Sequence, residues 1–226
     1  MDIHLDLLGN AEDSLERAME LVAFGDQQHD VRRLKQAIQA IAHAIELLLK
    51  ELLCRLHPCL IWERVEQYPQ LTAKTVTVDQ ALQRLAAIGN VKLPDYDLQL
   101  LRSLRATRNA IEHFSWTTTK QEAEAIVGQA LEFAFHFAAK ELERNYLDYA
   151  AHRDGVYAEL AASSPSFVRA RANRSRNPHG CGDPEPLVCE MCRARAVDPT
   201  TRGCRLCGHW GATWAGQGFD DEELPF

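Results

Sequence analysis

Cysteine is scarce over most of this 226-residue chain. The first 180 residues hold only Cys54 and Cys59, and the other five cysteines follow from Cys181 onward. A domain of roughly 160 residues buries enough apolar surface to fold without cross-links, whereas one of roughly 40 residues needs a metal or disulfides. The distribution therefore predicts a large N-terminal domain that needs no cross-link and a small C-terminal module that depends on one.

Long apolar runs and a secretory leader are also missing. No stretch approaches 18 uninterrupted apolar residues, and the first ten residues, MDIHLDLLGN, contain no basic segment. Both membrane spanning and secretion are therefore unexpected, and we expect a cytoplasmic protein. Clustered cysteines in a reducing compartment bind metal more often than they form disulfides.

The chain lacks net positive charge. Its formal net charge is −7, and residues 1–160 alone account for that value. Residues 161–219 carry an excess of four positive charges, because half of the acids of the C-terminal part lie at residues 220–223. An acidic chain binds nucleic acid poorly through non-specific attraction. Any role in nucleic-acid binding must therefore depend on a local basic patch.

Strand signals are nearly absent, and helical spacing of apolar residues fills residues 1–160. Only the short segment 75–78 (TVTV) has strand character, and it is too short to support a sheet. Asn10, Thr77 and Thr119 are candidate N-caps, and Pro94-Asp95 begins a further helix. The spacing predicts a mainly α protein, an antiparallel bundle of four to five helices, with helices over 10–24, 31–57, 78–88, from 94 onward, and 119–149.

The amino-acid composition changes after residue 160. We expect four segments: a helical bundle over 1–160, a basic linker rich in Pro, Ser and Arg over 161–186, a zinc ribbon-like module over 187–214 and an acidic tail over 215–226.

Four cysteines of the C-terminal module have the spacing of a metal site. Cys189-x2-Cys192 is followed, after eleven residues, by Cys204-x2-Cys207. Two such CxxC turns supply the four thiolates that tetrahedral Zn²⁺ prefers, although disulfides or an iron–sulfur cluster would use the same residues. Four thiolates close the coordination sphere, so the predicted zinc is structural rather than catalytic.

The residues suited to chemistry lie in the run LRSLRATRNAIEHF at 101–114. Arg102, Arg105 and Arg108 are three residues apart, and Asn109 and His113 share a helix face because they are four apart. Histidine transfers protons near neutral pH, and arginine binds phosphate with a permanent charge. Together they suit RNA cleavage by attack of the 2′-hydroxyl on the adjacent phosphate. Asn109 would orient His113 or a phosphate oxygen.

This run resembles a known family. Arg108-Asn109-x3-His113 matches the R-x4-6-H motif of the HEPN superfamily, including the frequent Asn after the Arg, and Glu46-x3-Lys50 matches its E-x3-K/R element in a preceding helix. The resemblance covers roughly residues 5–150, and the all-helical pattern agrees with it.

The resemblance implies a metal-independent endoribonuclease that acts as a homodimer, with the motifs of two protomers facing each other across a cleft. HEPN proteins of this type serve as toxins and in antiviral defence. The implied partners are RNA, such as tRNA or mRNA, a second copy of the chain, and an antitoxin or defence-complex protein. Zinc would be structural, and catalysis would need no cofactor. Arg108, Asn109 and His113 would be catalytic, with Glu46, Lys50, Arg102 and Arg105 supporting RNA binding.

A plainer interpretation accompanies each of these residues. Arg108 and Glu112 can form a solvated ion pair four residues apart, and Glu46 and Lys50 can do the same within their helix. The protein would then be a non-catalytic HEPN-like dimerisation or adaptor protein, with a zinc module for protein or nucleic-acid binding. Burial of His113 against apolar neighbours would favour this alternative.

Overall fold

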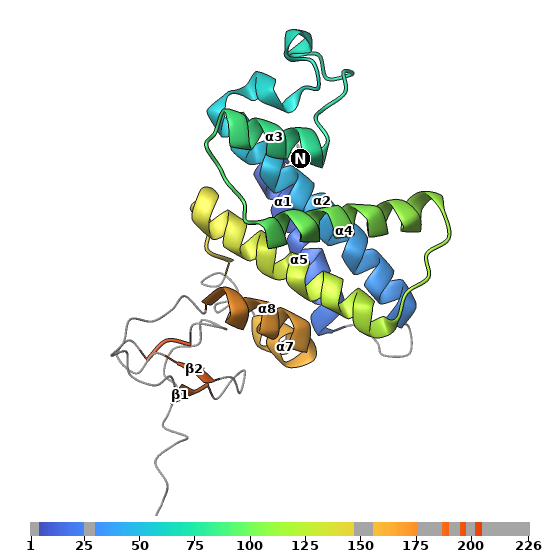
Figure 1. Cartoon of the computed structure of the whole chain (residues 1–226), viewed down its shortest axis with the longest axis vertical. Helices are drawn as coiled ribbons and strands as arrows, with labels where there is room; N and C mark the ends of the chain where they lie inside the picture. Colours follow the sequence, from blue (N-terminus) through green and yellow to red (C-terminus); the bar gives the residue numbers. More distant parts are fainter. Residues whose placement is uncertain are drawn as a thin grey trace, which may run out of the picture.

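The computed structural model describes residues 5–24, 30–146, 156–175, 187–189, 195–197 and 202–204. Helices dominate this described part (Figure 1), which confirms the prediction of a mainly α-helical protein. Its α-helices are α1 (Leu7–Ala23), α2 (Asp30–Leu56), α3 (Val78–Ala87), α4 (Asp95–His113), α5 (Lys120–Glu141), α7 (Val156–Ser163) and α8 (Pro165–Ser175). Two short 3₁₀ helices, η2 (Pro58–Ile61) and η3 (Val65–Gln67), lie between α2 and α3, and the strands β1 (Leu187–Val188) and β2 (Arg195–Val197) pair antiparallel.

Helix α2 is the centre of the helical core. It packs against α1, α3, α4 and α5, and the apolar side chains of its inner face are buried. Each large aliphatic side chain buried in this way stabilises the fold by about 1.5–3 kcal/mol. The positions that the sequence pattern assigns to this face include Ile38, Ile41, Ile45, Leu48, Leu49 and Leu53.

Side-chain caps set the starts of α3 and α5 as the sequence predicts. Thr77 and Thr119 each accept a hydrogen bond from the backbone N–H three residues on, and Gln80 and Glu122 bond back to the cap residues. These reciprocal contacts satisfy N–H groups that have no partner within the helix.

The predicted start of α1 at Asn10 is wrong. The helix begins at Leu7, with Asp6 as its N-cap, because the Asp6 carboxylate accepts a hydrogen bond from the Gly9 N–H at 2.7 Å. The earlier start brings Leu8 into the buried core. A single cap residue thus extends the apolar face of α1 by almost one turn.

Helix α5 also ends before the predicted boundary near residue 149. Its last residue is Glu141, and Glu143 adopts a left-handed backbone conformation with φ of 58°. The Arg144 N–H then donates to the Ala138 carbonyl at 3.0 Å, which closes the helix end. The Ala138 carbonyl therefore has a hydrogen-bond partner even though the helix does not continue.

Residues 161–175 differ from the predicted linker. Residues up to Ser163 belong to α7, and α8 packs along α5 (Figure 1). Phe167 is buried, and α8 comes so close to Gly128 of α5 that an added Cβ there would lie 2.5 Å from the Phe167 nitrogen. Residues 176–186 lie outside the described residues, and the division of the chain into domains stays a prediction.

Two arginines of the expected basic linker are used within the helical fold. Arg174 donates to Asp97 of α4 at 2.7 Å and to Glu132 of α5 at 2.9 Å, and Arg171 donates to Glu132 at 3.2 Å. Both carboxylates are only 1 % exposed. Burial raises the pKa of Glu132, and the guanidinium groups of Arg174 and Arg171 oppose that rise. These arginines therefore neutralise buried acids instead of presenting a basic surface.

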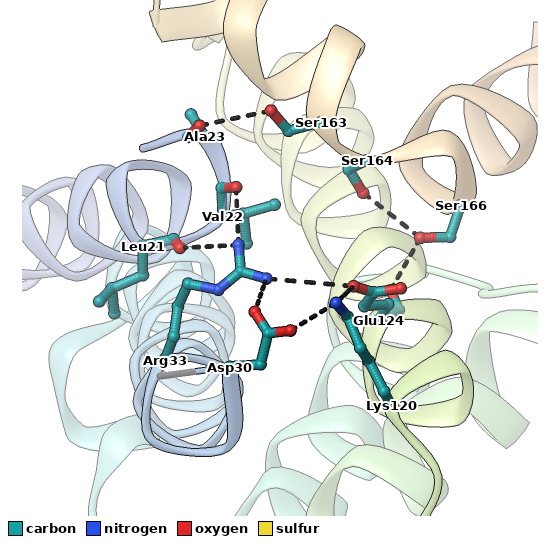
Figure 2. A network of polar contacts seen from close by, with 10 residues as sticks. All are labelled: Leu21, Val22, Ala23, Asp30, Arg33, Lys120, Glu124, Ser163, Ser164 and Ser166. Atoms are coloured by element: carbon teal, nitrogen blue, oxygen red, sulfur yellow. Dashed lines mark hydrogen bonds and ion pairs between the residues drawn. The ribbon is translucent and has the colours of Figure 1, made fainter. Parts of the chain in front are cut away.

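A second polar network joins the ends of several helices (Figure 2). Arg33 of α2 donates to the Val22 carbonyl near the end of α1 at 3.2 Å and to Asp30 at 2.9 Å. Lys120 of α5 pairs with Asp30 as well, and its hydrogen bond is the main reason that the pKa of Asp30 lies below its usual range. On the other side, the Ser166 hydroxyl of α8 donates to the Glu124 carbonyl at 2.8 Å.

None of the described helices is both long enough and apolar enough to cross a membrane.

Replacing Arg174 tests the role of the ion pairs that join α8 to Asp97 and Glu132. Arg174→Ala leaves Asp97 and Glu132 buried without their main counter-ion, so we expect the free energy of unfolding to fall by about 3–5 kcal/mol. The measurement is urea unfolding followed by circular dichroism. Arg169→Ala is the matched control, because Arg169 lies on the same helix and is exposed; it should change stability by less than about 0.5 kcal/mol. Equal effects of the two variants would contradict the assignment.

Candidate functional site

Helix α4 carries all the predicted catalytic residues and both flanking arginines. Leu101 and Leu104 face the core and are 3 % and 2 % exposed, whereas Arg102, Arg105 and Asn109 lie on the outer side. The apolar residues fix the orientation of the helix. The polar side of its C-terminal half therefore faces solvent.

Arg108 connects α4 to α2. Its Nε donates to Glu112 Oε1 at 3.0 Å, and its Nη1 lies 3.6 Å from Glu46 Oε2. The Arg108 side chain is one-third exposed. The guanidinium thus lies between one carboxylate of its own helix and one of the core helix, and it still reaches solvent.

Glu46 also binds Lys50, so one carboxylate serves two cations. Lys50 Nζ donates to Glu46 Oε1 at 2.6 Å and to Thr75 Oγ1 at 2.9 Å. Lys50 is 7 % exposed, and a buried ammonium needs such partners. Each oxygen of Glu46 therefore faces a different cation: Oε1 faces Lys50 and Oε2 faces Arg108.

His113 is the last residue of α4 and is open to solvent. Its side chain is 66 % exposed, and its Nε2 lies 3.8 Å from Glu112 Oε2. The ring of Phe114, a residue 79 % exposed, meets the imidazole edge-on, with centroids 6.4 Å apart. His113 therefore lies at the open C-terminal end of α4, beside the carboxylate of Glu112.

The remaining predicted residues of α4 contribute less to this arrangement. The Asn109 side chain is exposed and makes no hydrogen bond to another described residue in this single chain. Arg105 forms an ion pair with Asp79 of α3, and Arg102 is exposed. The predicted cations Lys50, Arg105 and Arg108 are therefore paired with the carboxylates Glu46, Asp79 and Glu112.

Two of these partners could not be expected from the sequence pattern. Thr75 lies 25 residues from Lys50, in the segment after η3, and Asp79 lies 26 residues from Arg105. Neither residue belongs to a motif, and only the packing of the loop and of α3 brings them close. The pairing of Arg108 with Glu112, by contrast, follows from their helical spacing.

A cavity lies at the opposite end of α4 from His113. It has a volume of about 470 Å³, and Tyr96, Asp97, Leu100 and Arg174 contribute to its lining. The Arg174 guanidinium stacks 5.2 Å from the centre of the Tyr96 ring and is already bound to Asp97. The candidate reacting groups therefore lie on the open surface of α4 and not in this cavity.

The predicted zinc ligands are described in part. Cys189 directly follows β1 and is fully buried, and Cys204 is 3 % exposed and forms an isolated antiparallel bridge with Val197 of β2. Cys192 and Cys207 lie outside the described residues. The zinc site therefore stays a prediction, since only two of its four thiols belong to the described residues.

Comparisons of the chain with models of protein families, with curated proteins and with solved structures found no match.

Proposed function

We propose that the protein is a metal-independent endoribonuclease of the HEPN type, a toxin or phage-defence effector. In this proposal residues 1–160 form a HEPN-like antiparallel helical bundle. Arg108 binds the scissile phosphate, His113 transfers a proton, and Asn109 positions the phosphate or the imidazole.

One observation carries the proposal: the two sequence elements that resemble the HEPN motifs meet in space. Arg108 lies 62 residues after Glu46 in the chain, yet its guanidinium is 3.6 Å from the Glu46 carboxylate, which Lys50 binds at 2.6 Å. His113 lies beside this group at the open end of α4. A phosphate-binding cation and an accessible proton-transfer group are thus placed on one helix, α4, and the cation is also paired with a carboxylate of α2.

The proposed reaction needs only groups of the protein and the RNA. A base takes the proton of the 2′-hydroxyl, and the freed oxygen attacks the adjacent phosphorus. The bond from phosphorus to the 5′-oxygen breaks, and an acid protonates that leaving oxygen. The products are a 2′,3′-cyclic phosphate and a 5′-hydroxyl. Arg108 would stabilise the charge that develops on the phosphate oxygens.

Base and acid are both required, and each chain offers one candidate histidine. In a two-fold dimer the His113 imidazoles of two chains would meet across one cleft, one as base and one as acid. Two features support this: His113 is 66 % exposed, and the neighbouring Phe114 presents an aromatic ring to solvent. An exposed aromatic ring beside a polar group is typical of surfaces that associate.

Zinc would stabilise the C-terminal module and take no part in the reaction. Cys189, Cys192, Cys204 and Cys207 would hold it. Four thiolates leave no open coordination position for water or substrate.

A second candidate function is a non-catalytic dimerisation or adaptor protein that uses the zinc module to bind protein or nucleic acid. It is favoured by the two carboxylates that surround Arg108, since an arginine paired with Glu46 and Glu112 can serve packing alone. His113, which lies close to Glu112, would then take no part in catalysis.

Replacing His113 distinguishes the two functions. We expect His113→Ala to lower the rate of RNA cleavage by about 10²- to 10⁴-fold, because general acid–base catalysis contributes that much. The measurement is single-turnover cleavage of a labelled RNA. His57→Ala is the control, because His57 is an exposed histidine that follows the last residue of α2, eleven residues from Glu46, and should leave the rate unchanged. Equal rates for wild type and His113→Ala would favour the adaptor.

The absence of a catalytic metal is tested by chelation and by the chemistry of the products. Cleavage should continue at an unchanged initial rate in EDTA, and the products should end in a 2′,3′-cyclic phosphate and a 5′-hydroxyl. Mass spectrometry of the fragments identifies these ends. Loss of cleavage before the helical fold is affected, or products with a 3′-hydroxyl, would contradict the proposed reaction.

A further inference from the structure

Both oxygens of the Glu112 carboxylate are turned toward the proposed reacting groups. Oε1 accepts the hydrogen bond of Arg108 Nε at 3.0 Å, and Oε2 lies 3.8 Å from His113 Nε2. The side chain is 27 % exposed. A negative group is therefore already placed between the guanidinium and the imidazole of the same chain.

That position is the one an RNA phosphate would need. A carboxylate and a phosphodiester bind the same N–H groups of arginine, because each presents two anionic oxygens that a guanidinium can bind together. Two anions close to one another repel, and at a partly exposed site this repulsion is felt strongly at low salt. A phosphate can bind Arg108 Nε only after the Glu112 carboxylate has moved aside.

The other carboxylate at Arg108 is held differently. Glu46 belongs to the core helix α2, and Lys50 binds its second oxygen at 2.6 Å. Glu112 has no lysine or arginine other than Arg108 among its described ion-pair partners. A partly exposed i,i+4 ion pair is weak, because water screens the attraction between its charges. Glu112 can therefore leave at small cost, whereas Glu46 stays in place.

We propose that Glu112 is an internal competitor for RNA: its carboxylate occupies the phosphate position between Arg108 and His113 until a phosphodiester displaces it. This inference rests on the proposed function, since it assigns the position between these two side chains to phosphate. Glu112 thereby lowers the affinity of the free protein for RNA. Glu112 would reduce the binding of a small anion more than the binding of an RNA strand, because the strand makes further contacts with the protein.

The test measures the binding of an RNA that cannot be cut. The probe is a short single-stranded RNA with 2′-O-methyl groups, and its binding to the full chain is followed by fluorescence anisotropy at low salt. Glu112→Gln removes the charge and keeps the side-chain shape. It should bind the probe about three- to tenfold more tightly than the wild type, and the gain should shrink as salt rises.

Glu51→Gln is the matched control. Glu51 likewise pairs with an arginine four residues away on its own helix, Arg55 at 2.9 Å, and the substitution changes the net charge by the same amount. It should leave the affinity within a factor of two of the wild type. An equal gain in both variants would show a general charge effect and would overturn the inference.

Failure of the inference and failure of the proposed function give different results. Unchanged or weaker binding by Glu112→Gln, or no binding by any variant, overturns the role of Glu112. A gain in affinity that Arg108→Ala abolishes supports it, whether or not cleavable RNA is cut. Absence of cleavage by a Glu112→Gln protein that binds more tightly would overturn the nuclease proposal alone.

Discussion

The arrangement of the candidate site depends on one carboxylate, that of Glu46 on the core helix α2. A carboxylate beside buried apolar residues must be compensated, and Glu46 is compensated twice. Lys50 binds it within α2, and Arg108 approaches it from α4. The second contact holds the C-terminal half of α4 against α2 at the position of Arg108. His113, the last residue of the same helix, remains exposed.

Charge holds α4 at both ends, but with different consequences. Near its N-terminus, Asp97 is 1 % exposed and bound by Arg174 of α8, so that contact stabilises the packing of α8. Near its C-terminus, Arg108 is one-third exposed and pairs with the partly exposed Glu112. Arginines that look alike in the sequence therefore have opposite roles. Arg171 and Arg174 of α8 pair with buried acids inside the fold, whereas Arg108 still reaches solvent.

Local patterns of the sequence predict much of the fold. Apolar spacing predicts α2, and the threonine caps predict the starts of α3 and α5, because these signals depend on residues within one or two turns. Helix α8 could not be predicted in this way. Its segment is rich in Ser, Pro and Arg, which is typical of a linker. The helix is held by ion pairs with Glu132 and Asp97, and a local sequence pattern does not show these pairs because the two acids lie far away in the chain. The same limit applies to the site: helical spacing places Arg108 and His113 on one helix, whereas Thr75 and Asp79 approach only through tertiary packing.

The most direct test is a structure of the protein bound to a short RNA that its 2′-O-methyl groups protect from cleavage. Our prediction is that a phosphate oxygen lies within hydrogen-bond distance of the Arg108 guanidinium and close to the His113 imidazole. The Arg108–Glu46 contact should be retained, and the Glu112 carboxylate should be turned away. An RNA bound elsewhere on the chain, with Glu112 still paired to Arg108, would contradict it.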